Sequence, residues 1–275
     1  MSFALYNTEL NNLWLGRFDI FPDSLFFHGI STRHGGVSQG AYDSLNLGLH
    51  VEDEKDAVLE NRRRFCRMVG AEPQRTATCQ QVHGDRVVRI TAKDAGAGFA
   101  DYAGAIPDTD ALITNEPGLP LMLFFADCTP ILLADPVNKA VGLAHGGWKG
   151  TVASIAEKTL HRMGEEFGTQ PKGVLVGIGP AIGPCCYEVG TEVADKFRTS
   201  FPYADACLLK EQDGHTYLDL WEANRQQMLR AGVPEENIQV AGECTCCRHK
   251  WYYSYRADGG KTGRIAAMIA LKPEA

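Results

Sequence analysis

Short apolar runs separated by turn residues dominate the hydrophobic pattern of the chain. Runs of this kind, bounded by Gly, Pro, Asn and Asp, are typical of β-strands. They predict strands at Leu25–Ile30, Thr76–Gln81, Arg86–Thr91, Ala111–Thr114, Leu121–Ala126, Ile131–Ala134, Ala140–His145, Val174–Ile178, Ile238–Ala241 and Arg264–Leu271. Several runs are apolar without alternation, which indicates strands that are buried on both faces.

Three other segments have their apolar residues at helical spacing. The first is predicted to begin at an Asp53 cap and to run to about Val69, with Gly70 at its end. The second follows Lys149-Gly150, ends at Gly168 and buries one face, formed by Val152, Ala156, Leu160, Met163 and Phe167. The third runs from Leu218 to Ala231. Because strands alternate with helices and no linker interrupts them, we expect one α/β domain over residues 1–275 with mixed or stacked sheets.

Composition and charge narrow the class of protein. The chain has 275 residues, of which 44% are hydrophobic and 22% are charged, as in an ordinary globular protein. No apolar run approaches the roughly 18 residues of a membrane span, and the N-terminus does not resemble a signal peptide, so no membrane is predicted. The net charge of −7 argues against nucleic acid as a partner but allows a local basic pocket for a small anion.

The cysteines indicate a reducing compartment. There are nine, an odd number, and two pairs are adjacent in the sequence: Cys185-Cys186 and Cys246-Cys247. This is unlike the disulfide framework of a secreted protein. The expected location is therefore the cytoplasm. The sequence leaves the oligomeric state open.

The candidate chemistry lies around a predicted β-hairpin. Residues 126–130 (ADCTP) lead into its first strand, and residues 144–148 (AHGGW) end its second strand. With a two-residue loop at 136–137, the register places Cys128 opposite His145, with Cβ atoms about 5 Å apart. A proline two residues after the cysteine cannot donate to the ladder, so a bulge could change this register. The glycines after His145 leave room for a ligand.

His83 is a candidate third member of this site. It lies between two predicted strands, in residues 80–85 (QQVHGD). Two histidines and one cysteine are an accepted ligand set for a catalytic zinc ion, whose fourth position is left to water or substrate. The same residues also suit a cysteine hydrolase, in which the Cys128 thiolate is the nucleophile and His145 is its base. The motifs do not separate these alternatives.

A series of ordered motifs covers the chain from about Phe26 onward. They are 31–38 (STRHGGVS), 42–48 (YDSLNLG), 81–84 (QVHG), 126–128 (ADC), 144–150 (AHGGWKG), 179–184 (GPAIGP), 244–245 (CT) and 253–256 (YSYR). With them the chain resembles the YfiH/YlmD-like family, whose members are described as laccase-domain polyphenol oxidases, purine nucleoside phosphorylases or peptidoglycan editing factors. In this family's pattern an alanine stands at Gly146 and a second arginine follows Arg256. Cys246 and Cys247 are not part of the pattern.

The resemblance implies a layered α/β/β/α fold, similar to the catalytic domain of the cytotoxic necrotizing factor. It also implies a zinc ion held by His83, Cys128 and His145, which would be the catalytic residues. The implied activities are a transferase reaction, phosphorolysis of adenosine, inosine and methylthioadenosine, and a hydrolase reaction, adenosine deamination. The implied partners are a nucleoside and phosphate.

Side chains that could bind these substrates are identified by their chemistry. The cationic candidates for phosphate are Arg33, Lys149 and Arg256. Asn46 and Gln81 could hydrogen-bond the sugar or the base. The combined signature of zinc deaminases, His-x-Glu with Pro-Cys-x-x-Cys, is absent from the sequence, so deamination would need another proton-transfer group, for which Asp127 is a candidate.

Three alternatives remain beside the nucleoside phosphorylase. One is a cysteine-type amide hydrolase acting on a peptidoglycan precursor. Another is a copper polyphenol oxidase, but eight histidines without any His-x-His pair do not suit a multicopper laccase, so copper is less favoured than zinc. The third is a structural zinc site among the late thiols, and for these residues free thiols are the favoured interpretation. They are Cys244, Cys246, Cys247 and His249, with Cys185 and Cys186 as further candidates.

Overall fold

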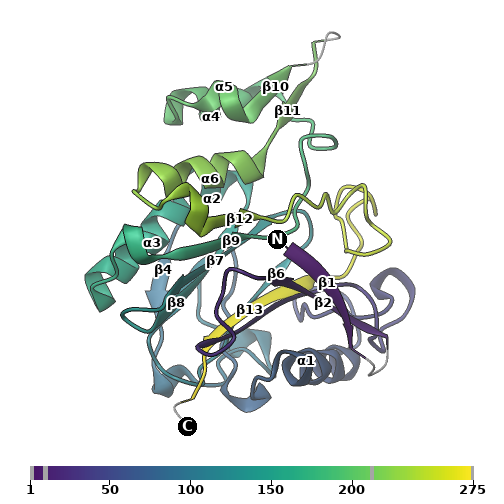
Figure 1. Ribbon diagram of the computed structural model, residues 1–275. Helices are drawn as coiled ribbons and strands as arrows, with labels where there is room; N and C mark the ends of the chain where they lie inside the picture. The colour runs from purple at the N-terminus through teal and green to yellow at the C-terminus, as the bar shows by residue number, and fades with distance from the viewer. Residues whose placement is uncertain (1–2, 9–11, 211–213, 274–275) are drawn as a thin grey trace.

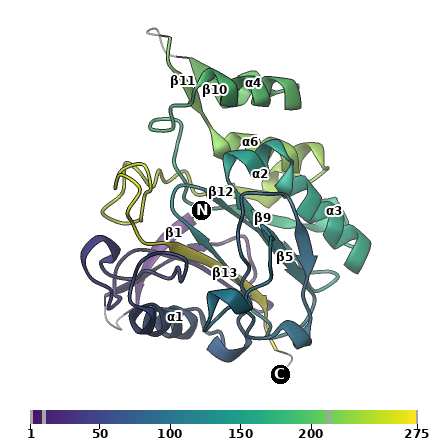
Figure 2. The same cartoon turned by 180° about the vertical axis from the view of Figure 1, so that it is seen from behind.

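The computed structural model describes residues 3–8, 12–210 and 214–273, and two stacked β-sheets form its centre (Figures 1 and 2). The first sheet is antiparallel and has the order β1 (Phe3–Thr8), β2 (Leu13–Phe18), β3 (Phe26–Ser31), β13 (Ile265–Leu271), β6 (Leu121–Phe125). The second has the order β12 (Ile238–Val240), β9 (Leu175–Ile178), β7 (Thr129–Asp135), β8 (Ala140–Gly146), β5 (Ala111–Thr114), β4 (Val87–Arg89). It is mixed, because its outer pairs β12–β9 and β4–β5 are parallel.

Helices cover the outer faces of both sheets. The described α-helices are α1 (Lys55–Val69), α2 (Trp148–Val152), α3 (Ile155–Phe167), α4 (Thr191–Ser200), α5 (Ala204–Cys207) and α6 (Leu220–Arg230), of which α1, α3 and α6 form these outer layers. Figure 1 shows α1 below the first sheet, and α3 and α6 above the second. Buried residues of α1 share a core with the first sheet, and those of α3 share one with the second. The layers therefore follow the order α/β/β/α, which confirms the expected fold class.

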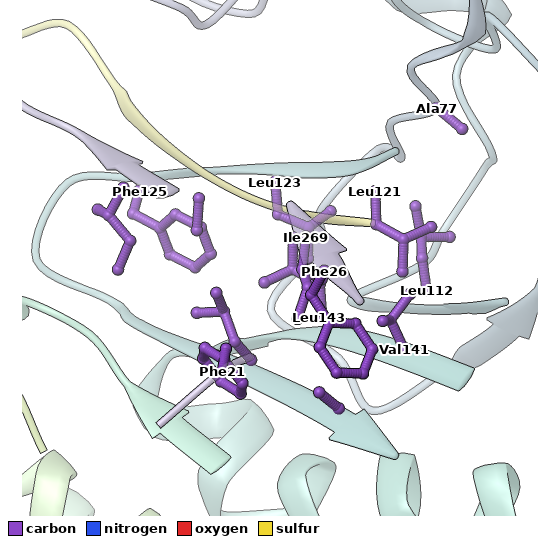
Figure 3. Packing of buried hydrophobic residues seen from close by; sticks show 14 of the residues in the cluster. Phe21, Phe26, Ala77, Leu112, Leu121, Leu123, Phe125, Val141, Leu143 and Ile269 are labelled. Carbon is purple, nitrogen blue, oxygen red and sulfur yellow. The ribbon is translucent and has the colours of Figure 1, made fainter. Parts of the chain in front are cut away.

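The main hydrophobic core lies between the two sheets. Phe26, Leu123 and Ile269 of the first sheet lie against Leu112 and Leu143 of the second, as Figure 3 shows. All five are almost completely buried. Since both faces of β7 and β8 are covered, these strands have the unbroken apolar sequences that the pattern indicated.

A smaller unit extends beyond α6 and has a core of its own. It contains α4, α5 and a two-stranded hairpin of β10 (Leu208–Lys210) and β11 (Thr216–Leu218). Figures 1 and 2 both show this unit at the end of the molecule farthest from α1. None of the described helices is long and apolar enough to cross a membrane.

The predicted register of the β7–β8 hairpin is wrong by two residues. Asp135 pairs with Ala140, so His145 pairs with Pro130 instead of Cys128. The cause is the Asp135 side chain, which accepts hydrogen bonds from the backbone N–H groups of Val137 and Asn138 and thereby widens the turn to four residues. Because the shift is an even number of residues, it leaves every side chain on its predicted face of the sheet.

Three other local predictions also differ from the structure. Residues 76–81 form no strand, because Ala77 bridges to β6 while Cys79 bridges to Ile106 on another segment. The predicted second helix is split into α2 and α3 by Ser154, whose φ is 61°. Asp53 is not the N-cap of α1: that position is Glu54, and the Asp53 carboxylate accepts hydrogen bonds from other side chains.

Candidate active site

His83, Cys128 and His145 come together at one end of the second sheet. One ligand atom from each of the three side chains lies within 4.8 Å of the other two. His145 lies near the end of β8, Cys128 lies in the connection between β6 and β7, and His83 lies in the loop before β4. The structure therefore brings together the three residues that the sequence singled out.

Asp110 holds this cluster in place from behind. Its Oδ1 atom lies 2.8 Å from Nδ1 of His145. The same carboxylate accepts hydrogen bonds from the backbone N–H groups of Val82, His83 and Gly84, at 3.2, 2.9 and 2.7 Å. The carboxylate favours a proton on Nδ1 of His145, which leaves Nε2 available as a ligand or base. Sequence reasoning missed Asp110, although its position directly before an apolar strand was a signal.

Electrostatics couple Cys128 to the histidines. Burial raises the pKa of the Cys128 thiol, but the imidazoles of His145 and His83 outweigh this effect and lower the pKa to about 6. Burial lowers the pKa of His145, and the Cys128 thiolate and Asp110 outweigh it and raise the pKa to about 9. Without a metal, the pair therefore favours a thiolate and an imidazolium. The thiolate is also the form of cysteine that binds metals.

Backbone geometry makes space for the cluster. His83 and Asp127 have φ angles of 62° and 84°, in the left-handed region. A Cβ atom at Gly147 would lie 3.0 Å from Cδ2 of His83 and 3.1 Å from Sγ of Cys128. The carboxylate of Asp127 accepts hydrogen bonds from Oγ1 of Thr245 and from the backbone N–H of Arg256, both at 2.7 Å. These bonds give Asp127 a role in holding the turn before Cys128.

A pocket of about 560 Å³ opens beside the three residues. This volume lies within the usual range for small-molecule sites. Aromatic side chains form much of its wall: Tyr102, Phe124, Trp148, Tyr187 and Tyr255. Two nitrogen ligands and one thiolate that face a pocket fit a metal ion with one open position.

The predicted substrate-binding residues divide into two groups. Gln81 and Arg256 line the pocket. However, both ends of the Gln81 amide are hydrogen-bonded to the backbone of Phe124, each at 2.8 Å. The Arg256 guanidinium donates to the carbonyl oxygens of Cys186 and Glu188, at 3.1 and 3.2 Å, and its remaining N–H groups can bind an anion.

The structure does not bring Arg33, Asn46 or Lys149 to the pocket wall. Arg33 donates to the carbonyl oxygens of Asp43 and His249 and stacks on Tyr253. Asn46 is completely buried. Its Oδ1 atom accepts hydrogen bonds from backbone N–H groups, and its Nδ2 atom donates to a carboxylate. The Lys149 ammonium lies 5.6 Å from the ring centroid of Trp148. These contacts explain why the three polar side chains are held elsewhere.

Two basic residues of the pocket were missed from the sequence. His50 and Arg264 both line it. Burial, together with the neighbouring Arg264 and Arg62, lowers the pKa of His50 to about 3, so His50 is neutral in ordinary conditions. The polar Arg264 directly before the apolar run of β13 was a signal for a residue at a sheet edge. The backbone N–H of Arg264 donates to Asn46, so Asn46 acts on the pocket indirectly.

Comparisons with known proteins identify the family of this chain. Residues 27–272 match the model of a family described as multi-copper polyphenol oxidoreductase laccase. The chain is 43% identical to a protein named purine nucleoside phosphorylase YlmD from Geobacillus stearothermophilus, over 90% of each chain. It is 37% identical to one named purine nucleoside phosphorylase YfiH from Escherichia coli, over 88% of this chain and 92% of that protein.

The fold agrees as well. A crystal structure of YlmD from Geobacillus stearothermophilus superimposes with a TM-score of 0.92 at 39% identity, covering 98% of this chain and 99% of the other. Matches of this length and identity confirm the resemblance seen in the motifs. The chain belongs to the laccase-like family that includes the YfiH and YlmD proteins.

Proposed function

We propose that the protein is a zinc-dependent purine nucleoside phosphorylase. Its substrates would be adenosine, inosine and methylthioadenosine, and it would also deaminate adenosine. One observation carries the proposal: His83, Cys128 and His145 converge on the wall of a pocket that also contains aromatic rings and two arginines. The names of the relatives from Geobacillus stearothermophilus and Escherichia coli support the same reaction.

Zinc suits the ligand set better than copper. Two imidazoles and a thiolate are compatible with either metal. A blue-copper centre usually adds a weak axial methionine, and no methionine is among the described residues that line the pocket. When bound, zinc would supply a Lewis acid that polarises the substrate or lowers the pKa of a water molecule. Asp110 would keep His145 oriented for this ion.

The pocket residues suggest how the reactants would be held. The aromatic side chains offer flat surfaces for a purine. Arg256 and Arg264 offer guanidinium groups for phosphate. In phosphorolysis a phosphate oxygen forms a bond to the anomeric carbon of ribose while the bond from that carbon to the base nitrogen breaks, and the departing base takes a proton. Holding phosphate and nucleoside together lowers the entropic part of the barrier.

The test is incubation of the purified protein with adenosine, with and without phosphate, followed by chromatography. We expect adenine and ribose 1-phosphate only when phosphate is present. Inosine should form in both conditions, because deamination consumes water and not phosphate. If none of the three products appears at high enzyme concentration, the nucleoside assignment is wrong. The Cys128→Ser variant is the control for a contaminating enzyme.

A cysteine-type amide hydrolase is the second candidate, and the coupling of Cys128 to His145 favours it. The lowered pKa of the Cys128 thiol and the raised pKa of the His145 imidazole favour a thiolate nucleophile whose proton has already moved to the imidazole. A peptidoglycan precursor would be the substrate. Amide cleavage that survives a chelator and is abolished by alkylation of Cys128 would support the hydrolase. Activity lost to the chelator and restored by zinc would contradict it.

A further inference from the structure

Four cysteines from two segments about 60 residues apart in the sequence lie close together. They are Cys185 and Cys186, which follow the 179–184 motif, and Cys244 and Cys247, which follow β12. Their four Sγ atoms all lie within 4.8 Å of one another. Sγ of Cys247 is 3.3 Å from that of Cys186 and 3.5 Å from that of Cys185. None of the four forms a disulfide.

These distances are those of a tetrahedral thiolate site. With zinc–sulfur bonds of about 2.3 Å, the sulfurs of a regular tetrahedron are about 3.8 Å apart. The observed separations of 3.3 and 3.5 Å and the upper limit of 4.8 Å bracket this value. Small displacements of the side chains would therefore bring all four sulfurs to bonding distance of one ion.

Two backbone N–H groups stabilise negative charge on the sulfur of Cys244. Its Sγ accepts hydrogen bonds from the N–H groups of Gly183, at 3.2 Å, and Cys247, at 3.5 Å. The second bond spans Cys244-x-x-Cys247, the spacing with which one loop supplies two ligands to a structural zinc ion. Amide N–H groups directed at a ligand sulfur orient it and stabilise its charge.

We propose that Cys185, Cys186, Cys244 and Cys247 bind a structural zinc ion, distinct from the site at His83, Cys128 and His145. The ion would have four protein ligands and no position for substrate. This refines the set considered from the sequence, because Cys246 and His249 lie outside the cluster. The site does not depend on the proposed catalytic activity.

The ion would cross-link two segments, one at Cys185 and Cys186 and one at Cys244 and Cys247, and each segment is followed by residues that line the pocket. Tyr187 follows Cys186 directly and lines the pocket, and Arg256 of the second segment donates to the carbonyl oxygen of Cys186. Thr245, between two of the ligands, holds Asp127 next to Cys128. The zinc ion would therefore stabilise the pocket wall without touching the substrate.

The first test counts zinc by mass spectrometry in protein that has been loaded with zinc and desalted. We expect about two ions per chain in the wild type, and one each in His83→Ala and in Cys185→Ser/Cys247→Ser, which replaces the two exposed cysteines. Combining all three substitutions should leave none. Cys246→Ser is the matched control and should keep both ions. If it loses one ion, the ligand set is wrong.

A second measurement does not need the double serine variant to fold. The His83→Ala protein is loaded with cobalt in place of zinc, and we expect the strong visible and charge-transfer absorption of tetrahedral cobalt with four thiolates. Absence of these bands, or a native mass lowered by the hydrogens of a disulfide among the four cysteines, would overturn the proposal. A third outcome is possible, in which the four cysteines bind zinc and the site at His83 does not. Wild type and His83→Ala would then each hold one ion, and the double serine variant would hold none. This result supports the four-cysteine site and contradicts zinc at His83.

Discussion

The two groups of possible metal ligands in the described part of the chain are built differently. At His83, Cys128 and His145, nitrogen and sulfur ligands are mixed, a carboxylate supports them from behind, and a pocket of about 560 Å³ opens in front. The second cluster has only sulfur ligands, and it is supported by backbone N–H groups. Its Cys185 and Cys186 do not line that pocket.

Under the two proposals, the first site would serve chemistry and the second would serve stability. Three ligands leave one position of a tetrahedral ion open to substrate, whereas four close it. The two sites are nonetheless linked, because Asp127 is held by Thr245 and directly precedes Cys128. Loss of the first site should therefore abolish activity, whereas loss of the second should affect stability and positioning.

We call the site at His83, Cys128 and His145 the open site and the four-cysteine site the closed site. The largest expected effect follows from replacing a ligand of the open site. We expect Cys128→Ser to lower kcat/KM for phosphorolysis at least about 1000-fold, because the metal's charge stabilisation is worth several kcal/mol. In the second cluster, Cys185→Ser/Cys247→Ser should lower kcat/KM by no more than about tenfold, because these residues only position the wall. Steady-state kinetics on both proteins checks the contrast. Equal losses would remove the distinction between the two sites.

The next effect concerns the carboxylate behind the open site. Asp110→Asn should reduce zinc affinity and kcat/KM by about 10- to 100-fold, as is typical when a supporting carboxylate is lost. The amide cannot accept from three backbone N–H groups and His145 as a carboxylate does. Zinc affinity is measured by competition with a chelating dye. The exposed Asp108, two residues earlier, supplies the control Asp108→Asn, which should behave as wild type.

Thiol reactivity in the metal-free protein gives a smaller contrast with a defined pH dependence. The pKa of Cys128 is lowered to about 6, so its thiolate forms as the pH rises through 6. Burial and neighbouring thiols raise the pKa of Cys185 and Cys186. At pH 6 we expect iodoacetamide to label Cys128 about ten times faster than an ordinary cysteine, after allowing for the lower nucleophilicity of a low-pKa thiolate.

Peptide mass spectrometry of labelled protein measures these rates. The rate at Cys128 should reach a plateau above about pH 7, because the thiol is then ionised. The rates at Cys185 and Cys186 should still be increasing there. Labelling of these two residues at pH 6 as fast as Cys128 would show that the clusters do not differ in charge state.

The sequence was sufficient to predict the layered fold and to single out three residues, His83, Cys128 and His145, that the structure brings together. Long apolar runs located β5 to β9 and β13, because strands covered on both faces have no polar positions to obscure the pattern. Cys128 and His145 could be found because they lie beside such runs, whereas His83 lies in a loop and was found from the motif around it. Their motifs, more than their spacing, identified the family.

Other features could not be derived because they depend on tertiary contacts. α4 buries only Ala194 and Phe197, too few residues for a visible apolar stripe. The register of β7 and β8 depends on hydrogen bonds of the Asp135 side chain. Asp110 acquires its role only when β5 and β8 pair, and the four-cysteine cluster only when two segments about 60 residues apart meet.

The smallest expected effect tests how closely the open site is packed. In Gly147→Ala the new methyl group would lie 3.0 Å from the His83 ring and 3.1 Å from the Cys128 sulfur, so both side chains must move by a few tenths of an ångström. We expect zinc affinity and kcat/KM to fall about three- to tenfold, since displacement of this size misaligns ligands without removing them. Gly146→Ala is the matched control: its methyl group would meet Ile131, Asn224 and the carbonyl oxygen of Thr129 but neither His83 nor Cys128, and it should keep wild-type zinc affinity. The four-cysteine site should bind its ion equally in both variants. If Gly147→Ala binds zinc as tightly as Gly146→Ala, the open site is more tolerant than its geometry indicates, and the contrast with the closed site must rest on the ligands alone.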